Sequence, residues 1–191
     1  ITDDGLVELY SRTAKDFYGL DNITRDVSDI LYKQALYPPQ DIYLDGEIYL
    51  HGKQLQDISG AVRGEGEVSG DVQRSKLKYY VFDCFLQSKP KMTQQERKEL
   101  LLHLFEDKHY ESLVLVEGRL AHSREEMEKI YDEYLEQGYE GAIARRLERA
   151  YEPSKNNYHS DALVKIKPFQ TDEYEVTGFK DGAGKEKGAV F

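Results

Sequence analysis

A chain of 191 residues with 39% hydrophobic and 32% charged residues is typical of a globular protein and is long enough to bury a core. It has no apolar run near the ~20 residues that a membrane span needs and no signal-peptide pattern, so we expect neither a membrane protein nor a secreted one. The formal charge of −10 excludes a protein that coats nucleic acid with its whole surface, although it leaves room for a local basic track.

The chain opens with an Asp-Gly turn at residues 2–5, of the kind that joins two hairpin strands, and residues 6–10 alternate as a strand. A hairpin needs a strand before its turn, so we expect this sequence to be a piece of a longer chain. Residues 21–36 predict a helix with Val27, Ile30 and Leu31 on one face. Pro38 and Pro39 then end it.

The middle of the chain predicts two strands. Residues 42–50 form a strand that is interrupted by the polar triplet Asp45-Gly46-Glu47, and residues 79–86 form the most apolar strand, which we expect to be central. Between them, residues 55–62 indicate a short helix in a glycine-rich segment. The single cysteine, Cys84, excludes an internal disulfide and any cysteine-based zinc site, and its apolar surroundings predict a buried structural thiol.

Two capping boxes mark the next helices. Thr93 with Glu96, and Ser123 with Glu126, have the spacing at which side chains and backbone N–H groups bond reciprocally. Gly138 marks the end of the second helix. Short strands are predicted at residues 114–116 and 139–146, and the cluster of Arg145, Arg146 and Arg149 is a candidate basic track.

Residues 162–169 predict a strand on which Lys165 and Lys167 share one face, while Val164 and Ile166 point into a core. Two cations about 7 Å apart repel by about 2 kcal/mol at an effective dielectric of about 20. An anion between them would remove that cost. By itself the pair is better explained as a solvated strand edge.

Other charged residues lie on short strands with no helical explanation: Arg12, Glu47 and Glu140. If these strands belong to one antiparallel sheet, the cations meet phosphate groups and the carboxylates hold a hard divalent cation, since Mg²⁺ favours one or two carboxylates plus phosphate oxygens. Phe82 on the central strand offers a ring face to a base. The pattern predicts a polyphosphate site.

The order of these motifs resembles that of the covalent nucleotidyltransferases, and specifically of ATP-dependent DNA ligases. Five motifs match in order: Ser11-Arg12, Asp45-Gly46-Glu47, Tyr80-Val81-Phe82-Asp83, Glu140-Gly141 and Lys165-Ile166-Lys167-Pro168. Segments 56–62 and 184–191 also resemble the family. The resemblance implies an α+β nucleotidyltransferase fold of packed antiparallel sheets flanked by helices. It places this adenylation domain at residues 1–169 and the start of an OB-fold β-barrel at residues 170–191.

The resemblance implies an enzyme that seals nicks in duplex DNA with ATP as AMP donor and Mg²⁺ or Mn²⁺ as metal. We expect a monomer, encoded by a cell, a phage or a virus, and the missing signal peptide indicates the cytoplasm or nucleus. It assigns ATP contacts to Arg12, Glu47, Phe82, Lys165 and Lys167, catalysis to Lys165, Lys167 and Arg12, and metal binding to Glu47 and Glu140.

The sequence departs from the motif pattern of DNA ligases at two places, and these differences leave other functions open. The family's nucleophile lies in a Lys-x-Asp-Gly motif, which the sequence lacks, so we expect that lysine upstream of Ile1. Lys155 also stands near a position where relatives often carry arginine, and it lacks the bidentate fork. The alternatives are an RNA capping guanylyltransferase or RNA ligase, and a catalytically inactive nucleic-acid-binding module of the same fold.

Overall fold

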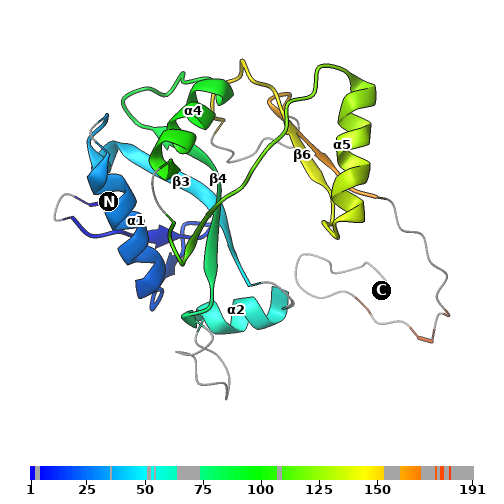
Figure 1. Ribbon diagram of the computed structural model, residues 1–191. Coiled ribbons are helices and arrows are strands. Elements are labelled where there is room, and N and C mark those ends of the chain that lie inside the picture. The colour runs from blue at the N-terminus through cyan, green and yellow to red at the C-terminus, as the bar shows by residue number, and fades with distance from the viewer. Residues whose placement is uncertain are drawn as a thin grey trace.

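The computed structural model describes residues 1–2, 5–34, 36–50, 53, 55–63, 74–106, 109–152, 160–168, 175, 177–178 and 181. Within them the chain forms two lobes (Figure 1). The first lobe contains β1 (Leu9–Tyr10), β2 (Asp16–Phe17), α1 (Asp21–Lys33), a 3₁₀ turn (Pro39–Asp41), β3 (Ile42–Tyr49), α2 (Leu55–Arg63), β4 (Lys78–Leu86), α4 (Gln94–Phe105) and β5 (Leu113–Leu115). The second lobe contains α5 (Arg124–Glu136), β6 (Ala142–Arg145) and β7 (Leu163–Ile166).

The first lobe is built around a three-stranded sheet with the order β3-β4-β5. The apolar strand β4 is central, as predicted, and pairs antiparallel with β3 and parallel with β5. This sheet is therefore mixed, whereas the resemblance implied antiparallel sheets. The sheet packs against α1 and α4 (Figure 1).

The core of this lobe comes from the apolar faces that the sequence predicts. Val27, Ile30 and Leu31 of α1 are buried, and Val81, Cys84 and Leu86 of β4 are completely buried in the same core, with 0% exposure. Each fully buried Val, Leu or Ile side chain stabilises the fold by about 1.5–3 kcal/mol relative to an exposed one. Burial also raises the pKa of the Cys84 thiol to about 12, so the prediction of a structural thiol is confirmed.

The predicted helix ends are mostly confirmed. The capping box of α4 is complete, because Thr93 Oγ1 accepts from Glu96 N while Thr93 N donates to Glu96 Oε2. In α5 only half of the predicted box forms, since the Glu126 carboxylate accepts from His122 N instead. Helix α1 ends at Lys33, three residues earlier than predicted, and the Gln34 side chain bonds the turn that follows.

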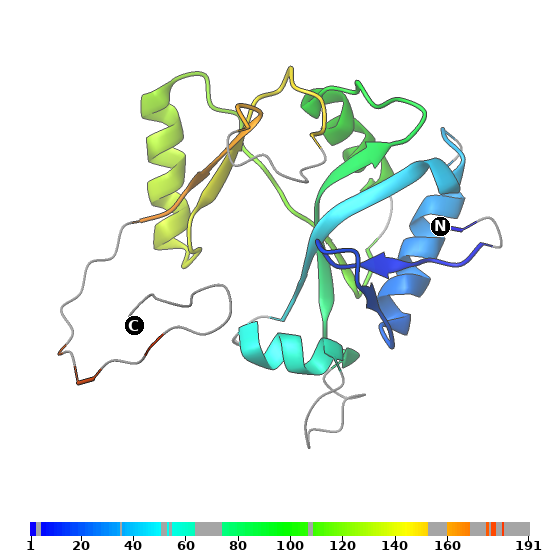
Figure 2. The ribbon, with the colours of Figure 1, turned by 180° about the vertical axis from the view of Figure 1, so that it is seen from behind.

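The second lobe is a two-stranded antiparallel sheet, β6-β7, with α5 along one side (Figure 2). The prediction that Val164 points into a core is wrong, because the residue is 58% exposed, and Ile166 is only half-buried. Both lie on a hollow of about 600 Å³ that Met127 and Tyr131 of α5 also line. Helix α5 therefore covers this face of β7 incompletely.

Several expectations lie outside the described residues. They include the part of the glycine-rich segment that follows residue 63, the position of Lys155, and most of the segment 170–191, where the sequence predicts the start of an OB-fold. All described helices and strands lie within residues 9–166. The division at residue 169 stays a prediction.

Candidate functional site

A cavity of about 800 Å³ lies between the two lobes. Its lining comes from β3 (Glu47, Tyr49), Lys53, α2 (Ile58), the entry to β6 (Glu140–Ile143) and β7 with the residue after it (Lys165–Lys167). This volume is within the range of small-molecule sites, which is about 300–1,000 Å³. Four of the six predicted site residues meet here: Glu47, Glu140, Lys165 and Lys167.

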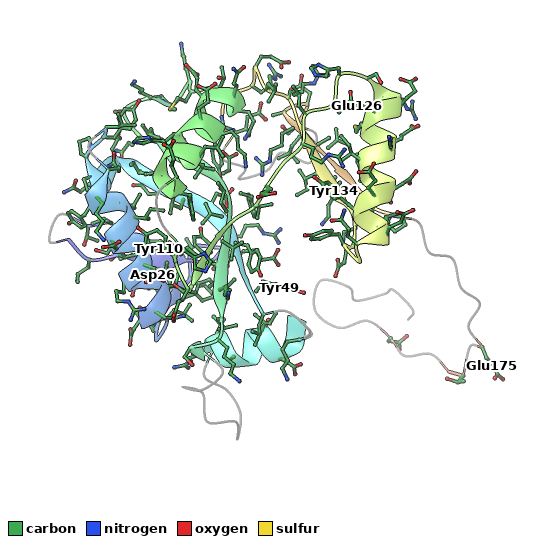
Figure 3. All side chains as sticks on the ribbon, in the orientation of Figure 1. Asp26, Tyr49, Tyr110, Glu126, Tyr134 and Glu175 are labelled. Carbon is green, nitrogen blue, oxygen red and sulfur yellow. The ribbon has the colours of Figure 1, made fainter. Side chains whose placement is uncertain are left out.

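Strand β3 supplies one wall of this cavity. Glu47 follows an irregularity in the β3–β4 pairing, where Asp45 pairs with Asp83 but Gly46 pairs with Val81. Glu47 and Tyr49 share a face because side chains alternate along a strand. Figure 3 shows Tyr49 on the side of the β3–β4 pair that faces the second lobe.

The opposite wall holds a pair of opposite charges. Lys167 Nζ donates to Glu140 Oε2 at 2.9 Å, and this bond, followed by the lysine's charge, lowers the pKa of the Glu140 carboxyl. Lys165 lines the cavity beside them and adds a smaller lowering effect. The Glu140 side chain is 88% exposed, so its bond to Lys167 can exchange with bonds to a ligand.

Gly141 allows the entry to β6 to lie close against β7 in this wall. A Cβ at this position would stand 2.3 Å from the carbonyl oxygen of Ile166, which is closer than real Cβ contacts. The backbone after Glu140 can therefore approach β7 only if residue 141 has no side chain. This close approach brings Glu140 within reach of Lys167.

The charges of the cavity suit an anion with a cation bound to it. Three lysines (Lys53, Lys165, Lys167) and two glutamates (Glu47, Glu140) line it, in a chain whose net charge is −10. Among the described residues no cluster of three or more His, Cys, Asp or Glu side chains could hold a metal by itself. Two carboxylates fit Mg²⁺ or Mn²⁺ only if phosphate oxygens or waters complete the coordination.

Arg12 and Phe82 do not line this cavity. Arg12 is exposed in the turn between β1 and β2, where Ser11 N donates to Lys15 O at 2.8 Å. Phe82 is half-buried at the β3–β4 irregularity, and the guanidinium carbon of Arg145 lies 5.4 Å from its ring centroid. The charged residues do not share one sheet, because β3 and β7 belong to different sheets.

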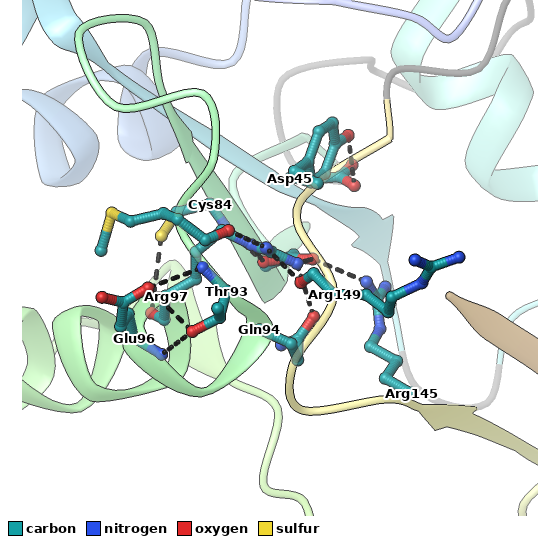
Figure 4. A network of polar contacts seen from close by, with 11 residues as sticks. Asp45, Cys84, Thr93, Gln94, Glu96, Arg97, Arg145 and Arg149 are labelled. Carbon is teal, nitrogen blue, oxygen red and sulfur yellow. Dashed lines mark hydrogen bonds and ion pairs between the residues drawn. The ribbon is translucent and has the colours of Figure 1, made fainter. Parts of the chain in front are cut away.

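A buried ion-pair network joins β4, α4 and the end of β6 (Figure 4). Asp83 is fully buried, and its carboxylate accepts from Arg97 Nε at 2.7 Å, Arg97 Nη2 at 3.0 Å and Arg145 Nη1 at 2.6 Å. Nearby, Tyr151 OH donates to Asp45 Oδ2 at 2.9 Å, and burial raises the pKa of the Asp45 carboxyl. The arginine cluster predicted as a basic track is thus divided, because Arg145 turns inward and Arg149 pairs with Asp161.

Two polar residues that line the cavity were not predicted from the sequence. Tyr49 could have been found, because it stands two residues after Glu47 on the same face of a predicted strand. Lys53 follows β3 in a glycine-containing segment, and no local pattern points to it.

None of the helices in the described parts of the chain is both long and apolar enough to cross a membrane. Among curated proteins, the DNA ligase of African swine fever virus (isolate Pig/Kenya/KEN-50/1950) is 38% identical over 191 residues, covering 98% of this chain and 43% of the viral protein. The DNA ligase of Thermococcus fumicolans is 25% identical over 193 residues, covering 96% of this chain and 33% of the relative. The chain therefore spans less than half the length of these relatives.

Solved structures share the fold at lower identity. A Lig E DNA ligase superposes with a TM-score of 0.69 at 21% identity, covering 96% of this chain and 64% of that one. A chlorella virus DNA ligase–adenylate superposes with a TM-score of 0.61 at 20% identity, covering 84% and 55%. The family model described as "ATP dependent DNA ligase domain" matches residues 1–167. The α+β fold predicted from the motifs is confirmed, and the chain belongs to the ATP-dependent DNA ligase domain family.

Proposed function

We propose that this chain forms the nucleotide-binding part of a DNA ligase that uses ATP to seal nicks in duplex DNA. The observation that carries the proposal is the cavity between the lobes, which gathers Glu47, Glu140, Lys165 and Lys167 from segments far apart in sequence. These are the residues that the motif order assigns to ATP and metal. The relatives named DNA ligase support the same activity.

Lys165 and Lys167 bind the α-phosphate of ATP in this proposal and stabilise the negative charge that develops on it during transfer. An attacking lysine amine forms a P–N bond to the α-phosphorus, and the bond to the β-phosphate oxygen breaks as pyrophosphate leaves. The sequence of residues 1–191 contains no Lys-x-Asp-Gly motif, so the proposal assigns this attack to a lysine outside it.

The AMP group then passes to the 5′-phosphate of a nick, and the 3′-hydroxyl displaces AMP to form the phosphodiester. Arg12 contacts the ribose or the nick phosphate, and its exposure in the β1–β2 turn leaves its guanidinium accessible to DNA. Phe82 stacks on adenine. The Arg145 guanidinium already lies over the Phe82 ring, so adenine must stack on the face of that ring that the guanidinium leaves free.

Glu47 and Glu140 are the residues that would hold Mg²⁺ or Mn²⁺, and Glu47 also binds the ribose. When bound, the ion would neutralise phosphate charge. Because Glu140 bonds to Lys167, a phosphate that attracts Lys167 also releases the Glu140 carboxylate for the metal. Binding of the nucleotide and of the metal are therefore expected to reinforce each other.

The test is labelling of the complete chain with radioactive ATP. We expect a covalent AMP adduct in the wild type, and its loss or strong slowing in Lys165→Ala and Lys167→Ala with an unchanged circular dichroism spectrum. Lys129→Ala on α5, an exposed lysine outside the cavity, is the matched control and keeps wild-type labelling. Wild-type rates in both cavity variants would refute the phosphate role.

The same assay separates the other candidates. Labelling by GTP and not ATP would favour a capping guanylyltransferase, and sealing of nicked RNA but not DNA would favour an RNA ligase. Binding of nicked DNA without any labelling would favour an inactive module of this fold. Sedimentation of the complete chain, which we propose to be a monomer, tests its oligomeric state.

A further inference from the structure

The two walls of the nucleotide cavity belong to different lobes, so something must fix the distance between them. One wall is β3 of the first lobe, and the other is the entry to β6 together with β7 of the second lobe. No strand pairing joins the two sheets among the described residues. The width of the cavity therefore depends on side-chain and loop contacts.

These contacts gather at the far end of β6. Arg145, its last residue, reaches back to the first lobe, where Nη1 donates to Asp83 Oδ2 at 2.6 Å. Its guanidinium also lies over the Phe82 ring at 5.4 Å. The side chain of Arg145 is 19% exposed and that of Asp83 is 0% exposed, so solvent screens this ion pair little.

Asp83 is itself held rigidly. Arg97 of α4 binds both of its carboxylate oxygens, in the two-point geometry that fixes the orientation of an arginine–carboxylate pair. Arg97 is anchored in turn by Met92 O at 2.8 Å and Gln94 Oε1 at 2.7 Å. Arg145 thus docks on a point of the first lobe that has little freedom to move.

The residues that follow β6 also bond to the first lobe, through backbone hydrogen bonds to α4. Gln95 N donates to Leu147 O at 3.0 Å, and Gln94 N donates to Arg149 O at 2.8 Å. From Arg145 back to Gly141, which lies in the cavity wall, an extended chain spans about 13 Å at ~3.3 Å per residue. A small rotation of β6 at Arg145 therefore moves the cavity wall by a larger distance.

We propose that Arg145 is a positioning residue, whose ion pair with Asp83 and contact with Phe82 set the angle of β6 and so the spacing of the two cavity walls. The proposal rests on the function proposed above, because it makes nucleotide affinity the property that Arg145 controls. It assigns Arg145 no bond to ATP, because its guanidinium is engaged by the Asp83 carboxylate and the Phe82 ring.

The test compares Arg145→Leu with Arg145→Lys in the complete chain. Leucine keeps bulk but removes the charge, whereas lysine keeps a cation that can still reach Asp83. The matched control is Arg124→Leu, which removes an exposed ion pair with Glu128 on α5 of the same lobe. All measurements are made well below the melting temperature of the least stable variant.

The first readout is the distance between the lobes. Spin labels on Leu102→Cys in α4 and Lys129→Cys in α5 report it by pulsed dipolar spectroscopy, since both positions are exposed and Cys84 is buried away from the label. We expect a narrow distribution in the wild type and in Arg124→Leu, and a broader or shifted one in Arg145→Leu. An unchanged distribution in Arg145→Leu would overturn the proposal.

The second readout is ATP affinity. If the correctly spaced state falls to about one tenth of the population, apparent affinity weakens about ten-fold. We expect this in Arg145→Leu, with partial recovery in Arg145→Lys. A purely structural role would lower the melting temperature without changing affinity, and that result would overturn the proposal. A wild-type chain that binds no ATP would overturn the proposed function instead, and the distance measurements would still decide whether Arg145 positions the lobes.

Discussion

Gly46 and Gly141 stand where the backbone comes too close to a neighbouring strand for any side chain. A Cβ at Gly46 would lie 2.4 Å from Tyr80 O, and one at Gly141 would lie 2.3 Å from Ile166 O. In both cases the obstacle is backbone, which cannot rotate away as a side chain would. Each glycine directly adjoins a predicted metal ligand, Glu47 or Glu140.

We therefore predict that Gly46→Ala and Gly141→Ala each lower the free energy of unfolding by about 1–3 kcal/mol, as overpacking does. Gly118→Ala is the control, because a Cβ there meets nothing within 4 Å, and its effect should stay within about ±0.5 kcal/mol. Urea denaturation measures all three. Equal stability of the three variants would contradict the crowding at Gly46 and Gly141.

The ion pair of Glu140 and Lys167 predicts a pH effect at a single residue. The hydrogen bond from Lys167 and then its charge lower the pKa of Glu140 from its ordinary value of 4.5. A carboxyl group with a lowered folded-state pKa contributes stability above its unfolded pKa and loses it as the pH falls through the folded pKa. We expect a titration of the Glu140 carboxyl carbon by nuclear magnetic resonance to show this lowered pKa, and Lys167→Ala to raise it. An identical titration in the variant would exclude the pair in solution.

At the scale of elements, helix α4 is joined to strand β4 by a buried ion pair in addition to apolar packing. Arg97 is 2% exposed and Asp83 is 0% exposed. Removing one partner of a buried pair leaves the other charge without compensation, which costs about 3–5 kcal/mol. In this chain Arg145 still neutralises part of the Asp83 charge, because it bonds the same carboxylate.

We predict that Arg97→Met lowers the free energy of unfolding by about 3 kcal/mol, at the lower end of that range. Arg124→Met, which removes an exposed i,i+4 pair on α5, should cost less than about 1 kcal/mol. Chemical denaturation of both variants provides the comparison. If Arg97→Met costs no more than Arg124→Met, the buried network does not stabilise the fold.

At the scale of the whole molecule, the two lobes differ in how much they bury. Helix α1 buries five residues, whereas α5 buries only Ile130. In the small sheet, Ile143, Leu163 and Val164 are 51%, 40% and 58% exposed. A lobe with few buried apolar contacts opens more easily than the core of the protein.

We therefore predict that backbone amides of β6, β7 and α5 exchange with deuterium at least about ten-fold faster than those of β4. Hydrogen exchange followed by mass spectrometry measures both regions in one experiment. ATP should slow exchange in β6 and β7 if the nucleotide bridges the two walls of the cavity. Uniform protection across both lobes without ATP would contradict the difference in burial.

Local patterns determined most elements of this protein. The alternating and helical spacings predicted β3, α2, β4, α4, α5, β6 and β7, and the Thr93–Glu96 box marked the start of α4. These features depend on residues a few positions apart, so the sequence alone contains the information. The order of the charged motifs likewise identified the family, because motif order is a property of the chain and not of its packing.

The tertiary structure alone decided how these pieces meet. It assigned Glu47 and Lys165 to separate sheets, left Val164 exposed, and turned Arg145 inward to an aspartate that is 62 residues away in sequence. A strand pattern shows which side chains share a face, but not which element that face will contact. That choice depends on the register and packing of distant segments, and it is what brings three of the five short motifs to one cavity.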